Sequence, residues 1–252
     1  MKKEFDIIGH RGNRDDFREN TIEGLKSVLG NNGISGIEID ITVTKDKKII
    51  LSHDLFLKEN SNKHLIYEHT YKELLEISER IDIDSPNKGK RYPLLDDVLK
   101  VFSKKSINQK LFIEIKSLPS NNFSMTINEI INYLHSLIKK YRIENTCYII
   151  SFDYRFIHES YLLDNKIKIG MILHRNIIPL DILIHNIKLS ILVLEKDWII
   201  NEYIKQAKKY NIDIYAWTPN LKKDWIRLIN LGVKGLITDV PKKMLQYKKI
   251  ME

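Results

Sequence analysis

The chain has 252 residues, which is longer than one average domain but typical of a single (β/α)8 barrel. Apolar residues make up 43% and charged residues 29%, which argues against an integral membrane protein and a disordered chain. The formal net charge is +8, yet the lysines are scattered and form no basic tail or block, so nucleic-acid binding is not expected. The positive charge suits anionic substrates or transient contact with a phospholipid membrane, although a general Lys, Ile and Asn bias explains it as well.

Short apolar runs alternate with longer amphipathic runs along the chain, which predicts repeated βα units. The predicted barrel strands cover residues 5–9, 36–43, 111–115, 147–151, 167–173, 189–194, 212–217 and 235–238, with a further strand-like stretch at 47–52. Helices are predicted at 20–29, 94–102, 125–140, 155–163, 198–210, 221–231 and 241–247, and 175–188 has no clear pattern. Eight strands with intervening helices predict a closed (β/α)8 TIM barrel, and an open doubly wound sheet is the alternative.

Residues 55–92 interrupt this alternation. They are polar, contain turn-forming clusters, and include one helical patch at 71–77. A connection of this length is unusual between barrel elements. We therefore expect a single domain, 1–252, that carries an inserted lobe at about 55–92, after the second strand.

The ends of the chain and its one cysteine suggest a compartment. Cys147 lies in an apolar strand candidate and cannot form an internal disulfide. No apolar segment of signal-peptide length precedes Gly9, and no run approaches the roughly 18 apolar residues of a membrane span. A soluble cytoplasmic enzyme is expected. The sequence does not indicate an oligomeric state.

Acidic residues alternate with isoleucines near the ends of two predicted strands. Glu38 and Asp40 are two residues apart, so their side chains point the same way, and Glu114 stands in a similar pattern with Lys116. Three carboxylates without a thiolate select a hard divalent ion, Mg²⁺ or Ca²⁺. A solvent-exposed strand face is the alternative for Glu38 and Asp40. The flanking isoleucines argue against it, because they pack against helices in a barrel and turn the acids inward.

Two histidines and two cations accompany these acids. His10 and His53 follow apolar runs, and imidazole titrates near neutral pH, so they form a candidate general acid/base pair. Arg11 and Lys116 are suited to hold phosphate oxygens, or alternatively to balance the acids. Charged groups at strand ends are where α/β barrels place their chemistry, and this set favours phosphoester cleavage. The other six histidines are interpreted as bystanders.

Three further residues have two interpretations each. Trp217, at the end of a predicted strand, is either an apolar wall for a small alcohol or acyl chain or a packing residue. Glu19 precedes the predicted first helix and is a possible further metal ligand or substrate contact. Asp239 is interpreted as the cap of the last helix, which begins near Pro241.

An ordered set of motifs spans nearly the whole chain and resembles the glycerophosphodiester phosphodiesterase family. The set consists of Gly9-His10-Arg11-Gly12, Glu19-Asn20-Thr21, Glu38-x-Asp40, His53-Asp54, Glu114-x-Lys116, Trp217-Thr218 and the segment Gly232 to Asp239. The resemblance implies a TIM barrel with a small insertion after the second strand, and metal-dependent hydrolysis of glycerophosphodiesters to glycerol 3-phosphate and an alcohol. By position it assigns the metal ligands to Glu38, Asp40 and Glu114, the catalytic histidines to His10 and His53, and the phosphate-holding groups to Arg11 and Lys116.

The sequence departs from the family pattern at two places. Arg18 stands where a proline usually precedes Glu-Asn-Thr, and the segment after His53-Asp54 lacks the usual Arg-Thr-Thr, so substrate choice stays open. Rival functions are phospholipase D-like cleavage of lysophospholipids or sphingolipids, and a catalytically silent binding barrel. Retention of every acid, histidine and base argues against the silent barrel. His10 is favoured as the base and His53 as the acid, and either water or the glycerol 2-hydroxyl is the attacking group.

Overall fold

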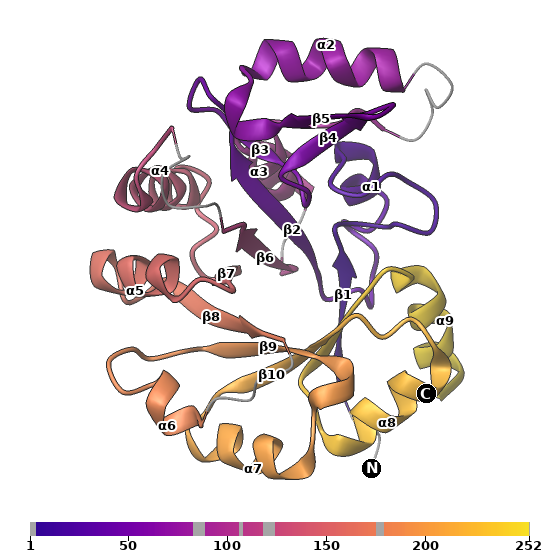
Figure 1. Ribbon diagram of the computed structural model, residues 1–252. Coiled ribbons are helices and arrows are strands. Elements are labelled where there is room, and N and C mark those ends of the chain that lie inside the picture. Colours follow the sequence, from indigo (N-terminus) through magenta and orange to yellow (C-terminus); the bar gives the residue numbers. More distant parts are fainter. Residues whose placement is uncertain (1–3, 83–88, 106–107, 118–123, 175–178, 252) are drawn as a thin grey trace.

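The computed structural model describes residues 4–82, 89–105, 108–117, 124–174 and 179–251. Eight parallel strands close into a barrel that the helices surround (Figure 1), so the predicted TIM-barrel fold is confirmed and the open sheet is wrong. The barrel strands, in the order in which they pair, are β1 (Asp6–His10), β2 (Gly36–Val43), β6 (Lys110–Ile115), β7 (Cys147–Ser151), β8 (Lys168–Leu173), β9 (Ile191–Glu195), β10 (Asp213–Trp217) and β11 (Gly235–Thr238). Closure follows because β1 pairs with both β2 and β11.

Helices surround the barrel, and all of them except α6 (Leu180–Leu183), which lies in the stretch without a clear sequence pattern, follow the predicted ones with shifted ends. They are α1 (Ile22–Lys26), α3 (Leu95–Lys105), α4 (Ile127–Lys140), α5 (Tyr154–Leu163), α6 (Leu180–Leu183), α7 (Asn201–Lys209), α8 (Lys222–Leu231) and α9 (Pro241–Met251). The first helix begins two residues later than predicted because Thr21 caps it, accepting a 3.2 Å hydrogen bond from the Gly24 amide. Residues 196–198 form a separate 3-10 turn, which delays α7 until Asn201.

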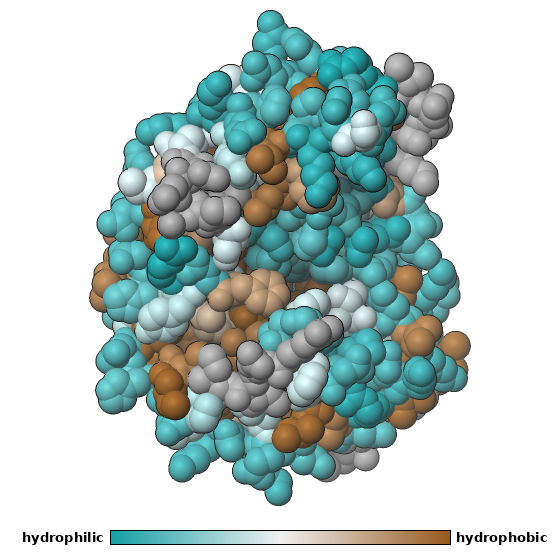
Figure 2. All heavy atoms as spheres, viewed as in Figure 1, coloured by the Kyte–Doolittle hydropathy of each residue, from teal (hydrophilic) through white to brown (hydrophobic). Residues whose placement is uncertain are grey.

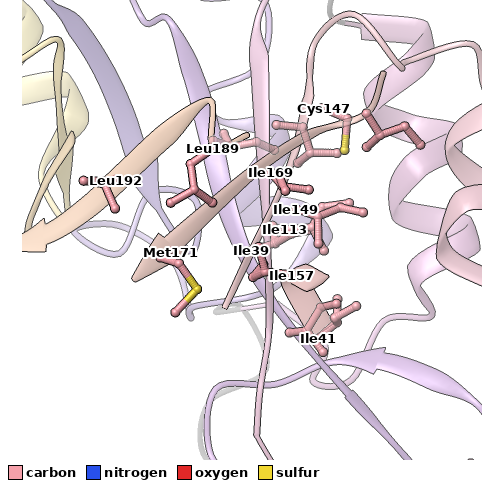
Figure 3. Close-up of a cluster of buried hydrophobic side chains, with 14 of the residues drawn as sticks. Ile39, Ile41, Ile113, Cys147, Ile149, Ile157, Ile169, Met171, Leu189 and Leu192 are labelled. Carbon is pink, nitrogen blue, oxygen red and sulfur yellow. The ribbon is translucent and has the colours of Figure 1, made fainter. Parts of the chain in front are cut away.

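Strand alternation separates the two faces of the barrel wall. On β2, Ile37, Ile39 and Ile41 are fully buried in the layer between strands and helices, so Glu38 and Asp40 face the interior. Figure 3 shows Ile39 and Ile41 in this layer together with Cys147. The direction that the isoleucines predict for the two acids is therefore the one observed.

The barrel interior is packed below the site. Phe112 stacks on Tyr148 with ring centroids 4.9 Å apart, and Tyr215 meets Phe112 edge-on at the same distance. At the amino end of the strands, the Tyr215 hydroxyl donates to Asp6 at 2.6 Å and accepts from Lys110 at 2.9 Å. These contacts fill the floor of the barrel, and the carboxyl end is left for chemistry.

The insertion expected after the second barrel strand is present. Strand β3 (Ile49–Leu51) runs antiparallel to β2 and is followed by a hairpin of β4 (Phe56–Glu59) and β5 (Asn62–Leu65), then by a 3-10 turn (Ile66–Glu68) and helix α2 (Tyr71–Ile81). This region has its own small core, which includes Leu57, Ile66 and Leu74. The hairpin was not predicted, because its short strands are polar and carry little alternation. The assignment of 1–252 to one domain, with a lobe at about 55–92, stays a prediction.

Membrane-spanning helices were searched for among the described residues. No helix there is both long enough and apolar enough to cross a bilayer.

His135 on α4 gives a pH-dependent stability. Its Nε2 lies 2.8 Å from the Ser160 hydroxyl on α5, and burial lowers its pKa from 6.5 to about 4. The unfolded chain therefore takes up this proton first, so the contribution is complete above about pH 7 and is lost as pH falls toward 4. We expect about 2 kcal/mol less stability at pH 5 than at pH 7.5 from this group, measured by urea unfolding. His135→Gln should flatten that part of the slope, and an identical pH slope in both proteins would contradict the assignment.

Candidate active site

A pocket lies at the carboxyl end of the barrel strands. Figure 2 shows this end, with hydrophilic residues on the side of the inserted segment and apolar residues on the side of β8 and β9. The polar lining residues are His10, Arg11, Glu38, His53, Glu114 and Lys116, and the apolar ones are Ile150, Phe152, Ile172, Val193, Trp217 and Ile237. The structure therefore brings together every predicted site residue, with Asp40 fully buried beside the pocket wall.

The three predicted metal ligands lie side by side on neighbouring strands. Asp40 on β2 is opposite Glu114 on β6, and Glu38, Asp40 and Glu114 each offer an oxygen within 4.8 Å of the others. All three side chains are buried. Burial, together with the charges of Asp40 and Glu114, raises the pKa of Glu38 well above its usual range, and the pKa of Glu114 rises to about 7. Crowded carboxylates of this kind fit a hard divalent cation.

The orphaned oxygens of the cluster support the same fit. Oε1 of Glu38 and Oδ1 of Asp40 are buried and have no hydrogen-bond partner within the described part of the chain. Buried polar atoms are normally satisfied, so unpaired oxygens at a site call for a ligand. The Lys116 ammonium lies 3.5 Å from that Asp40 oxygen, which offsets its charge without a well-formed hydrogen bond.

Two cations and an amide hold the cluster in place. The Arg11 Nε lies 3.1 Å from Asp40, and the Lys116 ammonium lies 2.5 Å from Glu114. Asn20 donates to the Asp40 carboxylate at 2.9 Å and accepts from the Asp40 amide at 3.1 Å. Burial alone raises the pKa of Asp40, but Arg11, Lys116 and His53 together bring it below its ordinary value. Asp40 is thus the fixed anion of the three.

The turn after β1 aims two groups of one residue at the acids. Arg11 has a φ of 56°, in the left-handed region, and its amide donates to Glu38 at 3.0 Å. The turn needs its flanking glycines. A Cβ on Gly9 would lie 2.6 Å from the Gly12 carbonyl oxygen, and Gly12 has a φ of 94°. Steric constraints therefore explain why glycines flank His10 and Arg11 in the Gly-His-Arg-Gly sequence.

His10 is oriented by a residue at the far end of the chain. Its Nδ1 lies 2.7 Å from Asp239, and its Nε2 faces Glu38 at 4.0 Å. Burial lowers the pKa of His10, so the ring is neutral near pH 7, with its proton on the nitrogen that faces the Asp239 carboxylate. Nε2 then presents a lone pair to the pocket.

The interpretation of Asp239 as a helix cap is wrong. Its carboxylate accepts from Asn220 at 2.7 Å and from Arg14 at 2.7 Å, in addition to the contact with His10. Sequence reasoning missed this role, although one signal was available. Asp239 directly follows β11 and is two residues after Ile237, which lines the pocket. Strand alternation therefore predicts that the Asp239 side chain also points into the barrel.

His53 reaches the pocket from outside the barrel wall. It follows β3, which the Ser52 amide anchors by donating to the Asp40 carbonyl at 3.1 Å. The His53 side chain is 34% exposed, and its Nδ1 lies 2.9 Å from the Asp54 carboxylate. One imidazole is thus buried and fixed, and the other is open to solvent.

Trp217 lines the pocket, whereas Glu19 lies outside the acidic cluster. The Trp217 ring lies at the pocket rim, 5.9 Å from the Phe152 ring and 5.8 Å from the His174 ring. Glu19 accepts from Arg11 at 3.0 Å and from Arg14 at 2.9 Å, so it orients these cations and is not in the acidic cluster.

The fold and this site define a class: a TIM barrel with a buried cluster of carboxylates that could hold a metal ion, flanked by imidazole and guanidinium groups. Residues 10–243 match the model of the Glycerophosphoryl diester phosphodiesterase family, and the chain belongs to this family. The resemblance found in the sequence is therefore confirmed, as is the enzyme class of glycerophosphodiester phosphodiesterase.

Individual relatives agree over most of their length. The chain is 27% identical over 241 residues to a glycerophosphodiester phosphodiesterase of Caldanaerobacter subterraneus subsp. tengcongensis, covering 95% of this chain and 96% of that one. A structure of a putative glycerophosphoryl diester phosphodiesterase from Silicibacter pomeroyi superimposes with a TM-score of 0.86 at 20% identity, covering 100% of this chain and 95% of that one. An Oleispira antarctica phosphodiesterase, solved in complex with the product sn-glycerol-3-phosphate, gives 0.82 at 20% identity, with 97% and 96% covered.

Cation binding at the acidic cluster should increase the thermal stability of the protein. We expect Mg²⁺ or Ca²⁺ to raise the Tm of the wild type, because the ion binds the folded state alone. Glu38→Gln should remove most of that rise, yet be no less stable than the wild type in EDTA, because it relieves repulsion among buried acids. Glu202→Gln on α7 is the matched control. An equal metal-induced shift in Glu38→Gln and wild type would contradict the site.

Proposed function

We propose that the protein hydrolyses glycerophosphodiesters to glycerol 3-phosphate and an alcohol, with Mg²⁺ or Ca²⁺ held by Glu38, Asp40 and Glu114. The observation that carries the proposal is the set of three buried carboxylates, whose oxygens lie within 4.8 Å of one another beside a pocket that two histidines line. Family membership and the fold shared with the product-bound Oleispira antarctica enzyme support the same substrate class.

A divalent ion at the acidic cluster would stabilise negative charge on the phosphoryl group, together with the two cations Arg11 and Lys116. When bound, a divalent ion polarises a phosphoryl oxygen and so eases attack on phosphorus. Arg11 and Lys116 line the same pocket, and each already contacts a carboxylate of the cluster. They offset the negative charge that develops on the phosphoryl oxygens, from positions that need no rearrangement during the reaction.

His10 is proposed as the general base. Asp239 fixes its ring and tautomer, and the low pKa that burial gives it keeps Nε2 free of a proton near pH 7. The attacking oxygen, from water or from the glycerol 2-hydroxyl, gives its proton to Nε2. Asp239 is a positioning residue that stabilises the imidazolium formed in that step.

His53 is proposed as the general acid. It lies on the side of the inserted segment, is partly exposed, and has Asp54 as a hydrogen-bond partner for Nδ1. The leaving oxygen takes the proton of the other ring nitrogen, which lets the alcohol leave as a neutral molecule. Trp217 and Phe152 close the opposite side of the pocket as an apolar wall against the glycerol carbons.

Leaving-group dependence separates the two histidines. We expect His53→Gln to lower kcat for glycerophosphocholine by at least ~100-fold, but to lower it little for a glycerol phosphodiester with a p-nitrophenyl leaving group, which needs no protonation. His10→Gln should lower both by similar factors, because a base is needed in either case. Steady-state kinetics with saturating Mg²⁺ provide the measurement.

The same assay has clear contrary outcomes. Full turnover of glycerophosphocholine in excess EDTA would defeat the metal-dependent proposal. Equal losses of His53→Gln with both leaving groups would reverse or remove its assignment as the acid. His158→Gln, at a partly exposed residue on α5, is the matched histidine control and should retain wild-type rates.

The link from Asp239 to His10 should be sensitive to a single atom. Asp239→Asn replaces an acceptor by an amide whose NH₂ favours the wrong tautomer of His10, so we expect kcat to fall ~10²- to 10⁴-fold with little change in KM. Arg14→Gln leaves the carboxylate in place and should have a much smaller effect. A near-normal kcat in a folded Asp239→Asn protein, verified by circular dichroism, would show that His10 is not positioned in this way.

A further inference from the structure

A second cavity opens beside the active-site pocket, on the side of the inserted segment. We call it the lobe pocket, and its walls include Arg18, His53, Asp54, Lys58, Arg91 and Tyr92. Among the residues that the structure describes, His53 alone lines both cavities. The proposed general acid therefore stands at the junction between the phosphate site and the lobe pocket.

We propose that the lobe pocket binds the alcohol arm of the diester and selects head groups that present oxygen acceptors, hydroxyl or carboxylate, over cationic ones such as choline. This inference rests on the proposed function and adds the class of substrate. The direction of the arm follows from the position of His53. A general acid must lie beside the leaving oxygen, so the leaving alcohol extends from the phosphorus past His53.

The charge of the walls opposes a cation. Arg18 lies 2.5 Å and Arg91 3.0 Å from the same carboxylate, Asp82, so two guanidinium groups share one negative charge. Lys58, which is exposed, adds a further positive charge to the lining. Burial and the neighbouring Arg91 lower the pKa of Arg18, in keeping with crowded positive charge. A quaternary ammonium head group would enter against this excess.

The acids on the lining do not reverse this balance. Glu19 already accepts from both Arg11 and Arg14. Asp54 is hydrogen-bonded to His53, and its side chain is 61% exposed, so solvent screens it. Neither acid is placed to neutralise Arg18 and Arg91.

The guanidinium groups have donors to spare for a ligand. Arg18 uses Nη1 for both Asp82 and the Gly89 carbonyl, and Arg91 uses Nε and Nη2 for Asp82. Within the described residues, Nη2 of Arg18 and Nη1 of Arg91 have no acceptor. Both side chains are held by Asp82, and preorganised guanidinium donors recognise oxygen acceptors at a low entropic cost.

The aromatic residues near the cavity are not arranged as a choline cage. Recognition of a quaternary ammonium needs open aromatic faces. Tyr92 is only 5% exposed, and the Phe56 ring is already covered by the Lys63 ammonium, 4.6 Å from its centroid. The chemistry of the lobe pocket is therefore that of hydroxyl or carboxylate recognition.

A three-substrate panel tests this inference. With saturating Mg²⁺, we expect the wild type to show a kcat/KM at least about tenfold higher for glycerophosphoglycerol and glycerophosphoserine than for glycerophosphocholine, since two lost guanidinium hydrogen bonds are worth about that factor or more. The first two substrates separate hydroxyl from carboxylate recognition. Arg91→Gln should reduce the selectivity ratio several-fold, mainly through KM.

Two further variants guard against a folding defect at Arg91. Lys58→Gln, at an exposed side chain, should shift the ratio in the same direction by a smaller factor. Arg80→Gln is the matched control, because Arg80 is 55% exposed and pairs with Glu59 away from the lining. It should leave all three rates unchanged.

The outcomes separate the two proposals. Equal or faster hydrolysis of glycerophosphocholine by the wild type, or Arg91→Gln and Lys58→Gln proteins with the wild-type selectivity ratio, would overturn the lobe-pocket assignment while leaving the proposed function intact. A wild type that hydrolyses none of the three diesters with any divalent ion would overturn the proposed function, and the lobe-pocket inference with it.

Discussion

The site depends on one electrostatic constraint: three carboxylates are buried together inside a barrel. Glu38, Asp40 and Glu114 have been removed from water, which is costly for charged groups unless partners compensate. Arg11 and Lys116 supply two positive charges against three acids, and the crowding raises the pKa of Glu38 and of Glu114. Neighbouring backbone and side-chain groups also contact the acids. The left-handed turn at Arg11 brings its amide to Glu38 and its side chain to Asp40, and Asn20 also donates to Asp40.

The barrel wall makes that burial possible. Alternation on β2 sends isoleucines outward to a dense apolar layer and acids inward, so the same strand stabilises the fold and carries the site. The packed rings of Phe112, Tyr148 and Tyr215 fill the interior below the acids. The carboxylates are thus held on strands with a solid support, and little movement is available to spread their charges apart.

Much of this arrangement was predictable from the sequence. The bounds of β2, β7 and β11 agree with the predicted ones because alternating or continuous β-branched runs end abruptly at polar residues. Convergence of Glu38, Asp40 and Glu114 followed from strand parity and the rule that parallel strand ends meet at one edge. In each case, the local sequence pattern agreed with the contacts that are found in the structure.

Two of the missed features depend on contacts between residues distant in the sequence. Asp239 is 229 residues from His10, so no local spacing links them. The β4–β5 hairpin is a local miss: its strands are only four residues long and mostly polar, and its turn contains Asn60 with a φ of 54°. Arg18, which appeared only as a departure from a family proline, has a partner in Asp82 on the inserted segment, 64 residues away. A proline has no such donor.

The two imidazoles belong to different parts of the architecture. His10 is the last residue of barrel strand β1, whereas His53 follows β3, where the inserted segment begins. In the proposed mechanism, this inserted segment therefore supplies the general acid as well as a wall of the lobe pocket. On this proposal, exchanging the inserted segment between homologous proteins would transfer the general acid and the alcohol preference together, while the acidic cluster stayed with the recipient barrel.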